Sequence, residues 1–152
     1  MTTIKKISTY LLGQDQIFVK IESSEPGLIG WGSAAFAGHH KLIAISVDKY
    51  LTDFLVGKEV TEIEDIWQTS QVQSSWRNDP ALNCALSAID QALWDIKGKE
   101  VGKSVVDLIG GRSRKAVPVL TKIEKNLDSG LVAEVAKFRK EGIQYFLINP
   151  KM

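Results

Sequence analysis

Cysteine is almost absent from this sequence. Cys84 is the single cysteine among 152 residues, so no intramolecular disulfide can form. Its neighbours Leu82, Ala85 and Leu86 are apolar, and no helix N-terminus or close cation is predicted to activate the thiol. Cys84 is therefore predicted to be a small apolar filler rather than a nucleophile.

Long apolar runs and an excess of one charge are also missing. No stretch approaches the roughly 20 apolar residues of a membrane span, and the short apolar run after Lys5 and Lys6 does not fit a signal peptide. Lys and Arg total 19 against 18 for Asp and Glu, and the cations are scattered. Nucleic acid and membrane are thus excluded as main partners, and a cytoplasmic location is expected.

The polar residues show no spacing that identifies a catalytic site. His39 and His40 are adjacent, so they point in different directions and cannot chelate one metal unaided, and a surface loop is the better interpretation. Asp90 and Asp95 are five residues apart, which is poor spacing for a joint site. Asp90, beside an apolar stripe, is predicted to hydrogen-bond to another helix.

The glycines carry structural rather than cofactor-binding information. The string "GLIGWG" is one residue short of the dinucleotide fingerprint and precedes a strand instead of a helix. Gly30 and Gly32 fall inside a predicted strand, where glycine indicates a bulge or a close backbone approach. The double glycine at 110–111 could hold an anion, but after a helix it is usually a stop.

The first third of the chain is predicted to be a β-meander. Residues 4–12, 16–22 and 28–37 have the β-branched and aromatic content of strands, and "SSEPG" at 23–27 is a turn. Helices are predicted next, over 41–57, from Thr61 onward, from Pro80 to Gly98, and in a short segment before Gly110. The face expected to be buried in the first helix comprises Ile43, Val47, Tyr50, Leu51, Phe54 and Leu55.

Three signals define the helix ends. Gly57 is predicted at C′ of the first helix. Thr61 and Glu64 form a candidate capping box for the second. Asp79 followed by Pro80 predicts the start of the third. From about residue 115 the pattern becomes strand, amphipathic helix and apolar strand, which is typical of a parallel β-α-β unit with strands buried on both faces.

The chain resembles the mandelate racemase/muconate lactonizing enzyme branch of the enolase superfamily, and within it the mannonate dehydratase-like group that includes starvation-sensing proteins. Four strings carry the likeness: "GLIGWGSAAFAG", "YLTDFLVGKEVTEIEDIWQ", "WRNDPALNCALSAIDQALWDIKGKEVGKSVVDLIGG" and "AVPV". The resemblance implies an α+β fold with a three-stranded antiparallel meander and a helical bundle as capping domain over 1–114. Residues 115–152 then form the first strand (116–123), helix (131–141) and second strand (145–149) of an incomplete β/α barrel.

The resemblance also implies chemistry for the full-length family: Mg²⁺-dependent proton abstraction next to a carboxylate, followed by loss of water. Because a complete barrel runs to roughly 250 residues, the metal ligands would lie on strands beyond residue 152. The expectation is therefore no cofactor in this chain and no catalytic activity by this chain alone.

Three family site positions fall within the chain, and all three are substituted. The likeness places Ala37 at a substrate-contacting Asn, Lys122 at a His that faces the site, and Leu147 at an Arg used in proton transfer. Methyl and isobutyl groups cannot make those hydrogen bonds, and an unpaired buried polar group costs about 1–3 kcal/mol.

Two functional hypotheses follow. The chain is the N-terminal part of a sugar-acid dehydratase whose partner is the rest of the barrel, or it is a free-standing non-catalytic protein for binding or oligomerisation. The exposed apolar strands "AVPVL" and "YFLIN" predict a homo-oligomer under both hypotheses.

Overall fold

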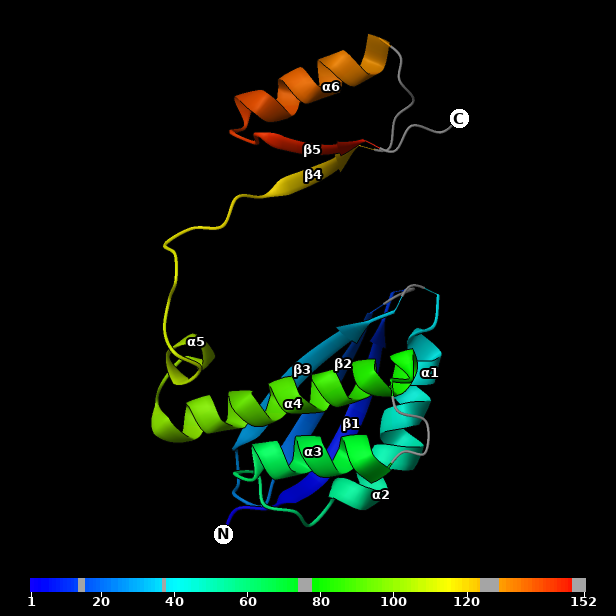
Figure 1. Ribbon diagram of the computed structural model, residues 1–152, viewed down its shortest axis with the longest axis vertical. Coiled ribbons are helices and arrows are strands. Elements are labelled where there is room, and N and C mark those ends of the chain that lie inside the picture. The colour runs from blue at the N-terminus through cyan, green and yellow to red at the C-terminus, as the bar shows by residue number, and fades with distance from the viewer. Residues whose placement is uncertain (14–15, 37, 74–77, 124–128, 149–152) are drawn as a thin grey trace. The chain divides into compact units, whose positions relative to one another are not determined.

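The computed structural model describes the 152-residue chain except for residues 14–15, 37, 74–77, 124–128 and 149–152. It divides the chain into two compact units, Met1–Gly111 and Arg112–Met152. Each unit has its own sheet (Figure 1). The predicted α+β class is confirmed: an antiparallel meander, then helices, then a parallel β-α-β unit.

The first unit is built on strands β1 (Ile4–Leu12), β2 (Gln16–Ser23) and β3 (Ile29–Ala35), which pair antiparallel in that order. Side chains alternate between the two faces of β2, because successive residues of a strand point to opposite sides. The residues of β2 on the inner face are fully buried: Ile17, Val19 and Ile21.

The predicted first helix is continuous but not uniform. It consists of α1 (His40–Ile45), a π-helical turn η1 (Ser46–Leu51) and α2 (Thr52–Leu55). A stripe recurring every fourth residue would drift around an α-helix of 3.6 residues per turn, and the wider π turn offsets that drift. Tyr50 is 69% exposed, so its predicted place on the buried face was wrong. The stripe that is buried comprises Ile43, Val47, Leu51 and Leu55.

The start of α3 (Ile63–Gln73) differs from the predicted capping box. The helix begins after Glu62, one residue later than a Thr61 cap requires. The Thr61 hydroxyl donates to the Glu59 carboxylate at 3.5 Å instead. The first intrahelical bond runs from the Ile66 N–H to the Glu62 carbonyl oxygen, so Glu62 and not Thr61 is the residue before the helix.

Helix α4 (Pro80–Val101) begins as predicted, since the Leu82 N–H donates to Asp79 Oδ1 at 2.7 Å. Its predicted end at Gly98 was wrong. The helix continues for three residues and ends at Gly102, whose φ of 65° is left-handed. Gly98 is required inside the helix by close packing, because a Cβ there would lie 2.7 Å from the Lys103 carbonyl oxygen.

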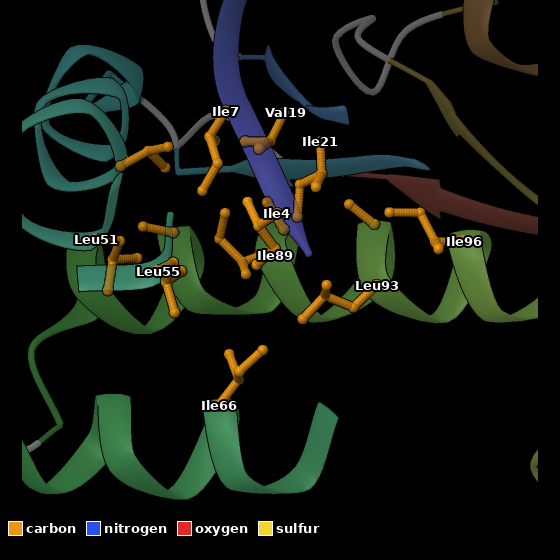
Figure 2. Close-up of a cluster of buried hydrophobic side chains, with 14 of the residues drawn as sticks. Ile4, Ile7, Val19, Ile21, Leu51, Leu55, Ile66, Ile89, Leu93 and Ile96 are labelled. Atoms are coloured by element: carbon orange, nitrogen blue, oxygen red, sulfur yellow. The ribbon is translucent and has the colours of Figure 1, made fainter. Parts of the chain in front are cut away.

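A single apolar core fills the space between the sheet, the first helix, α3 and α4 (Figure 2). Cys84 packs against this core as a partly buried residue. Figure 2 shows the buried side chains that converge from these elements: Ile4, Ile7, Val19, Ile21, Leu51, Leu55, Ile66, Ile89, Leu93 and Ile96. The short helix α5 (Val105–Leu108) follows α4. The positive φ angles of Gly110 and Gly111 are incompatible with a longer helix.

The second unit contains β4 (Leu120–Ile123), α6 (Ser129–Lys140) and β5 (Tyr145–Ile148), and its two strands pair parallel. Strand β4 begins four residues later than predicted, after Pro118, which cannot donate to a ladder. The prediction that the second strand is buried on both faces was wrong for this chain, since Leu147 is 46% exposed. One helix cannot cover both faces of a two-stranded sheet.

Candidate functional site

Two of the three predicted site residues lie side by side. Lys122 of β4 and Leu147 of β5 are Cα partners in the parallel register, so their side chains leave the sheet on the same face. Both are penultimate residues of their strands. The carboxyl ends of parallel strands are where α/β folds place their ligands. The structure thus joins a cation and an isobutyl group at the edge where a site would form.

Ala37, the third predicted residue, lies outside the described residues. Its flanks are described: the Phe36 and His39 rings stack at 4.7 Å, and the His39 N–H donates to the Phe36 carbonyl oxygen at 2.8 Å. His39 precedes α1, whereas His40 is the first residue of that helix, so only His39 matches the predicted loop. The ring stack and the hydrogen bond therefore link Phe36 directly to His39.

Position 37 follows strand β3 in the sequence, and two glycines of β3 set how closely that strand lies against α4. A Cβ on Gly30 would overlap the Ala92 carbonyl oxygen, and one on Gly32 would overlap that of Ala88. The predicted close backbone approach is confirmed at both positions. The glycines therefore fix the distance between the strand that leads to position 37 and the central helix.

Side chains of α4 form hydrogen bonds with the backbone groups at the outer edge of β3. The Trp31 N–H donates to Asp95 Oδ2 at 2.9 Å. The Gln91 amide accepts from the Ser33 N–H at 3.1 Å and donates to the Ser33 carbonyl oxygen at 3.1 Å, as a neighbouring strand would. These contacts protect an edge that would otherwise pair with another chain.

Lys99 completes this edge. Its ammonium donates to the Ile29 carbonyl oxygen at 2.8 Å and to Asp95 Oδ2 at 2.6 Å. These edge contacts were not predicted from the sequence, although the sequence contains a signal for them. Gln91, Asp95 and Lys99 recur every four residues on a helix that is otherwise mostly apolar, which indicates one polar stripe.

A groove of about 580 Å³ runs along the same stripe within the first unit. Trp31 and Ile109 stand at its rim, 40% and 65% exposed. Trp94 is partly buried. The remaining lining residues come from α4 and α5: Asp90, Gln91, Asp95 and Val105.

Asp90 has an unusual electrostatic environment. Burial raises the pKa of its carboxyl above the ordinary value of 3.8, and the nearby negative charge of Glu64 on α3 raises that pKa further. A hydrogen bond from the Trp94 indole acts in the opposite direction. The predicted hydrogen bond from Asp90 to another helix was therefore wrong: its partner is on α4 itself, and the facing helix offers a like charge.

The described residues do not fit a divalent metal. Within the described ranges, no group of three or more His, Cys, Asp or Glu side chains is placed to hold an ion. Lys122 and Leu147 are not metal ligands. In the same ranges, no helix is both long enough and apolar enough to cross a bilayer.

Comparison with known proteins identifies relatives over nearly the whole chain. Residues 5–110 match the mandelate racemase / muconate lactonizing enzyme N-terminal domain. A D-galactonate dehydratase family member of Salmonella virchow is 43% identical over 145 residues, and a D-galactonate dehydratase of Pectobacterium atrosepticum is 36% identical over 146. The crystal structure of an enolase from Pantoea ananatis with bound D-gluconate and Mg superposes with a TM-score of 0.88 at 40% identity.

The coverage of these matches is unequal. They include 95%, 96% and 99% of this chain but only 35%, 38% and 37% of the respective relatives. The chain thus spans about a third of the length of the proteins it matches. The portion that matches includes the meander, the helices and the β-α-β unit.

Proposed function

This chain belongs to the mandelate racemase / muconate lactonizing enzyme family of the enolase superfamily, and on that premise we propose that it supplies the capping domain and first strands of a sugar-acid dehydratase. The proposed reaction removes the proton next to the carboxylate of a polyhydroxy acid and expels a hydroxyl from the adjacent carbon as water. The enol that forms becomes a 2-keto-3-deoxy acid. The similarity to D-galactonate dehydratases carries this proposal.

Within the family we assign the chain to the mannonate dehydratase-like group, as its sequence strings suggest. Mannonate itself is expected to be a poor substrate. The expectation depends on positions 122 and 147, where the pair is a flexible cation beside an isobutyl group. Leu147 cannot hydrogen-bond a substrate hydroxyl, and a site left with an unpaired polar contact loses about 1–3 kcal/mol of binding.

We further propose that the chain is catalytically inactive by itself. Mg²⁺ in the full-length family would stabilise the enediolate formed by proton loss. The described residues include no oxygen-ligand cluster that could hold that ion. The role left to this chain is to form the cap and to carry one side of the substrate pocket.

An activity and binding assay tests the proposal. The purified 152-residue chain is incubated with Mg²⁺ and D-mannonate, D-gluconate or D-galactonate, and formation of the keto acid is followed. Calorimetric titration with Mg²⁺ is run in parallel. We expect neither turnover nor stoichiometric metal binding. A tight one-to-one Mg²⁺ isotherm would contradict the inactive assignment.

A second candidate is a non-catalytic protein that assembles through its strands. The supporting observation is the set of large apolar side chains exposed in the second unit: Val117, Val119, Leu120, Val132, Tyr145 and Leu147. Reading the gene downstream of the Met152 codon separates the two candidates. An open frame with further strands and acidic ligands supports the dehydratase, and a stop codon supports the assembly protein.

A further inference from the structure

Of the two carboxylates that line the groove, only one is paired with a cation among the residues that the structure describes. Asp95 is paired with the Lys99 ammonium and the Trp31 backbone N–H. The Gln91 side-chain amide is hydrogen-bonded to the backbone N–H and carbonyl oxygen of Ser33. Among the described residues, by contrast, no cation forms an ion pair with Asp90.

The Trp94 indole N–H lies near enough to the Asp90 carboxyl to lower its pKa by hydrogen bonding. A carboxylate has about four lone-pair positions, so one indole donor leaves acceptor capacity for a ligand. Glu64 on the facing helix adds negative potential near the same carboxyl. The groove therefore favours a positively charged occupant.

The aromatic lining favours the same charge. Trp31 and Trp94 both border the groove, and the face of an indole ring attracts cations more strongly than any other side-chain ring. A guanidinium suits this combination better than an ammonium, because its planar fork stacks on an indole while donating two hydrogen bonds to a carboxylate. The volume of about 580 Å³ is within the usual range for ligand pockets, so a guanidinium fits with room for the residues beside it.

We propose that this groove binds an arginine side chain presented by a protein segment. The guanidinium would lie between Trp31 and Trp94 and pair with Asp90. The exposed side chain of Ile109 at the rim, 65% accessible, offers apolar surface to the residues beside that arginine. The site is independent of the dehydratase chemistry, since it uses neither Lys122 nor Leu147.

Binding is tested on the full 152-residue chain with the peptide N-acetyl-Ala-Arg-Ala-amide. The indole N–H resonances of Trp31 and Trp94 are followed by NMR and identified with the W31F and W94F variants. We expect saturable shifts of both resonances. The isosteric citrulline peptide, which is neutral, should bind at least about tenfold more weakly, because it lacks the charge-assisted hydrogen bonds.

The variant Asp90→Asn should weaken arginine-peptide binding at least about tenfold. Asp53→Asn is the matched control, because Asp53 is an exposed carboxylate on α2, outside the groove. Equal affinity of D90N and the unsubstituted chain would overturn the proposal, as would equal binding of the citrulline peptide or no saturable shift. Circular dichroism confirms that D90N is folded.

Methylguanidinium distinguishes a protein segment from a small free cation. We expect it to bind at least about tenfold more weakly than the peptide, because it covers none of the apolar rim. Equal affinity for the two would overturn the assignment to a protein segment.

Discussion

Gly32 of β3 lies so close to Ala88 of α4 that a Cβ on the glycine would overlap the alanine's carbonyl oxygen. The obstacle is helix backbone, which cannot turn aside as a side chain could. Strand and helix are therefore in contact along their backbones. This contact sets the position of β3, and with it the polar stripe of α4 that borders the groove.

Gly32→Ala should lower the free energy of unfolding by more than about 3 kcal/mol, because overpacking against backbone cannot relax locally. Gly27→Ala is the control. Gly27 has a φ of +83° with no atom within 4 Å of an added Cβ, so its cost is conformational only. That cost is about 1–2 kcal/mol. Urea denaturation of both variants measures the difference, and equal losses would contradict a steric role for Gly32.

Gln91→Leu should expose the edge of β3. The Ser33 N–H and carbonyl both lose their side-chain partner, and water replaces it only in part. We expect a loss of about 1 kcal/mol in unfolding free energy and faster hydrogen exchange at the Ser33 amide. Gln68→Leu on α3, whose amide donates to Glu64 of the same helix, should leave that exchange rate unchanged.

Asp90→Asn should change how stability depends on pH. A carboxyl whose pKa is raised by folding does not lower the free energy of unfolding when the pH is below its pKa in the unfolded chain. The free energy of unfolding falls as the pH rises above that value, and the loss becomes constant once the pH exceeds the pKa in the folded chain. The variant and the unsubstituted chain should therefore unfold alike well below the ordinary pKa of 3.8, and the variant should be more stable at pH 7.

The size of this difference is modest. Water partly screens this partly buried carboxyl, so we expect about 0.5 kcal/mol. Urea denaturation at both pH values measures it. Glu64→Gln should give a smaller gain, because it removes the like charge but not the desolvation of Asp90. A D90N variant less stable than the unsubstituted chain at pH 7 would refute the interpretation.

Self-association should decrease when the apolar side chains of β5 are made acidic. In the double variant Tyr145→Glu with Leu147→Glu, the second carboxylate lies across from Lys122 and keeps the strand pair intact. We expect the average mass from light scattering to fall toward that of the monomer at high concentration. Ile45→Glu replaces a residue that is 50% exposed on α1, and it should leave the mass unchanged.

Much of the fold could be predicted from local patterns. The Asp79–Pro80 start of α4, the strand composition of β2 and the glycines of β3 were all evident in the sequence. Each depends on residues within one turn or one strand, where capping chemistry, β-branched side chains and the missing Cβ act directly.

The candidate site was only partly predictable. Positions 122 and 147 came from family resemblance, and only the strand register made them neighbours. The contact between Trp31 and Asp95 joins residues 64 positions apart, and no local pattern specifies such a pair. Two further features could not be predicted locally, because both depend on neighbouring segments: the π turn in the first helix and the place of Gly98 inside α4.

The sequence by itself determined which segments form strands and helices, where several of them begin, and the family to which the chain belongs. Tertiary structure alone decided that α4 closes the edge of β3, that Asp90 faces Glu64, and that two indoles meet at one groove. The physical reason is the sequence distance over which each interaction acts. Backbone propensity and capping act between near neighbours in the sequence, whereas burial, charge and edge pairing depend on which distant segments pack together.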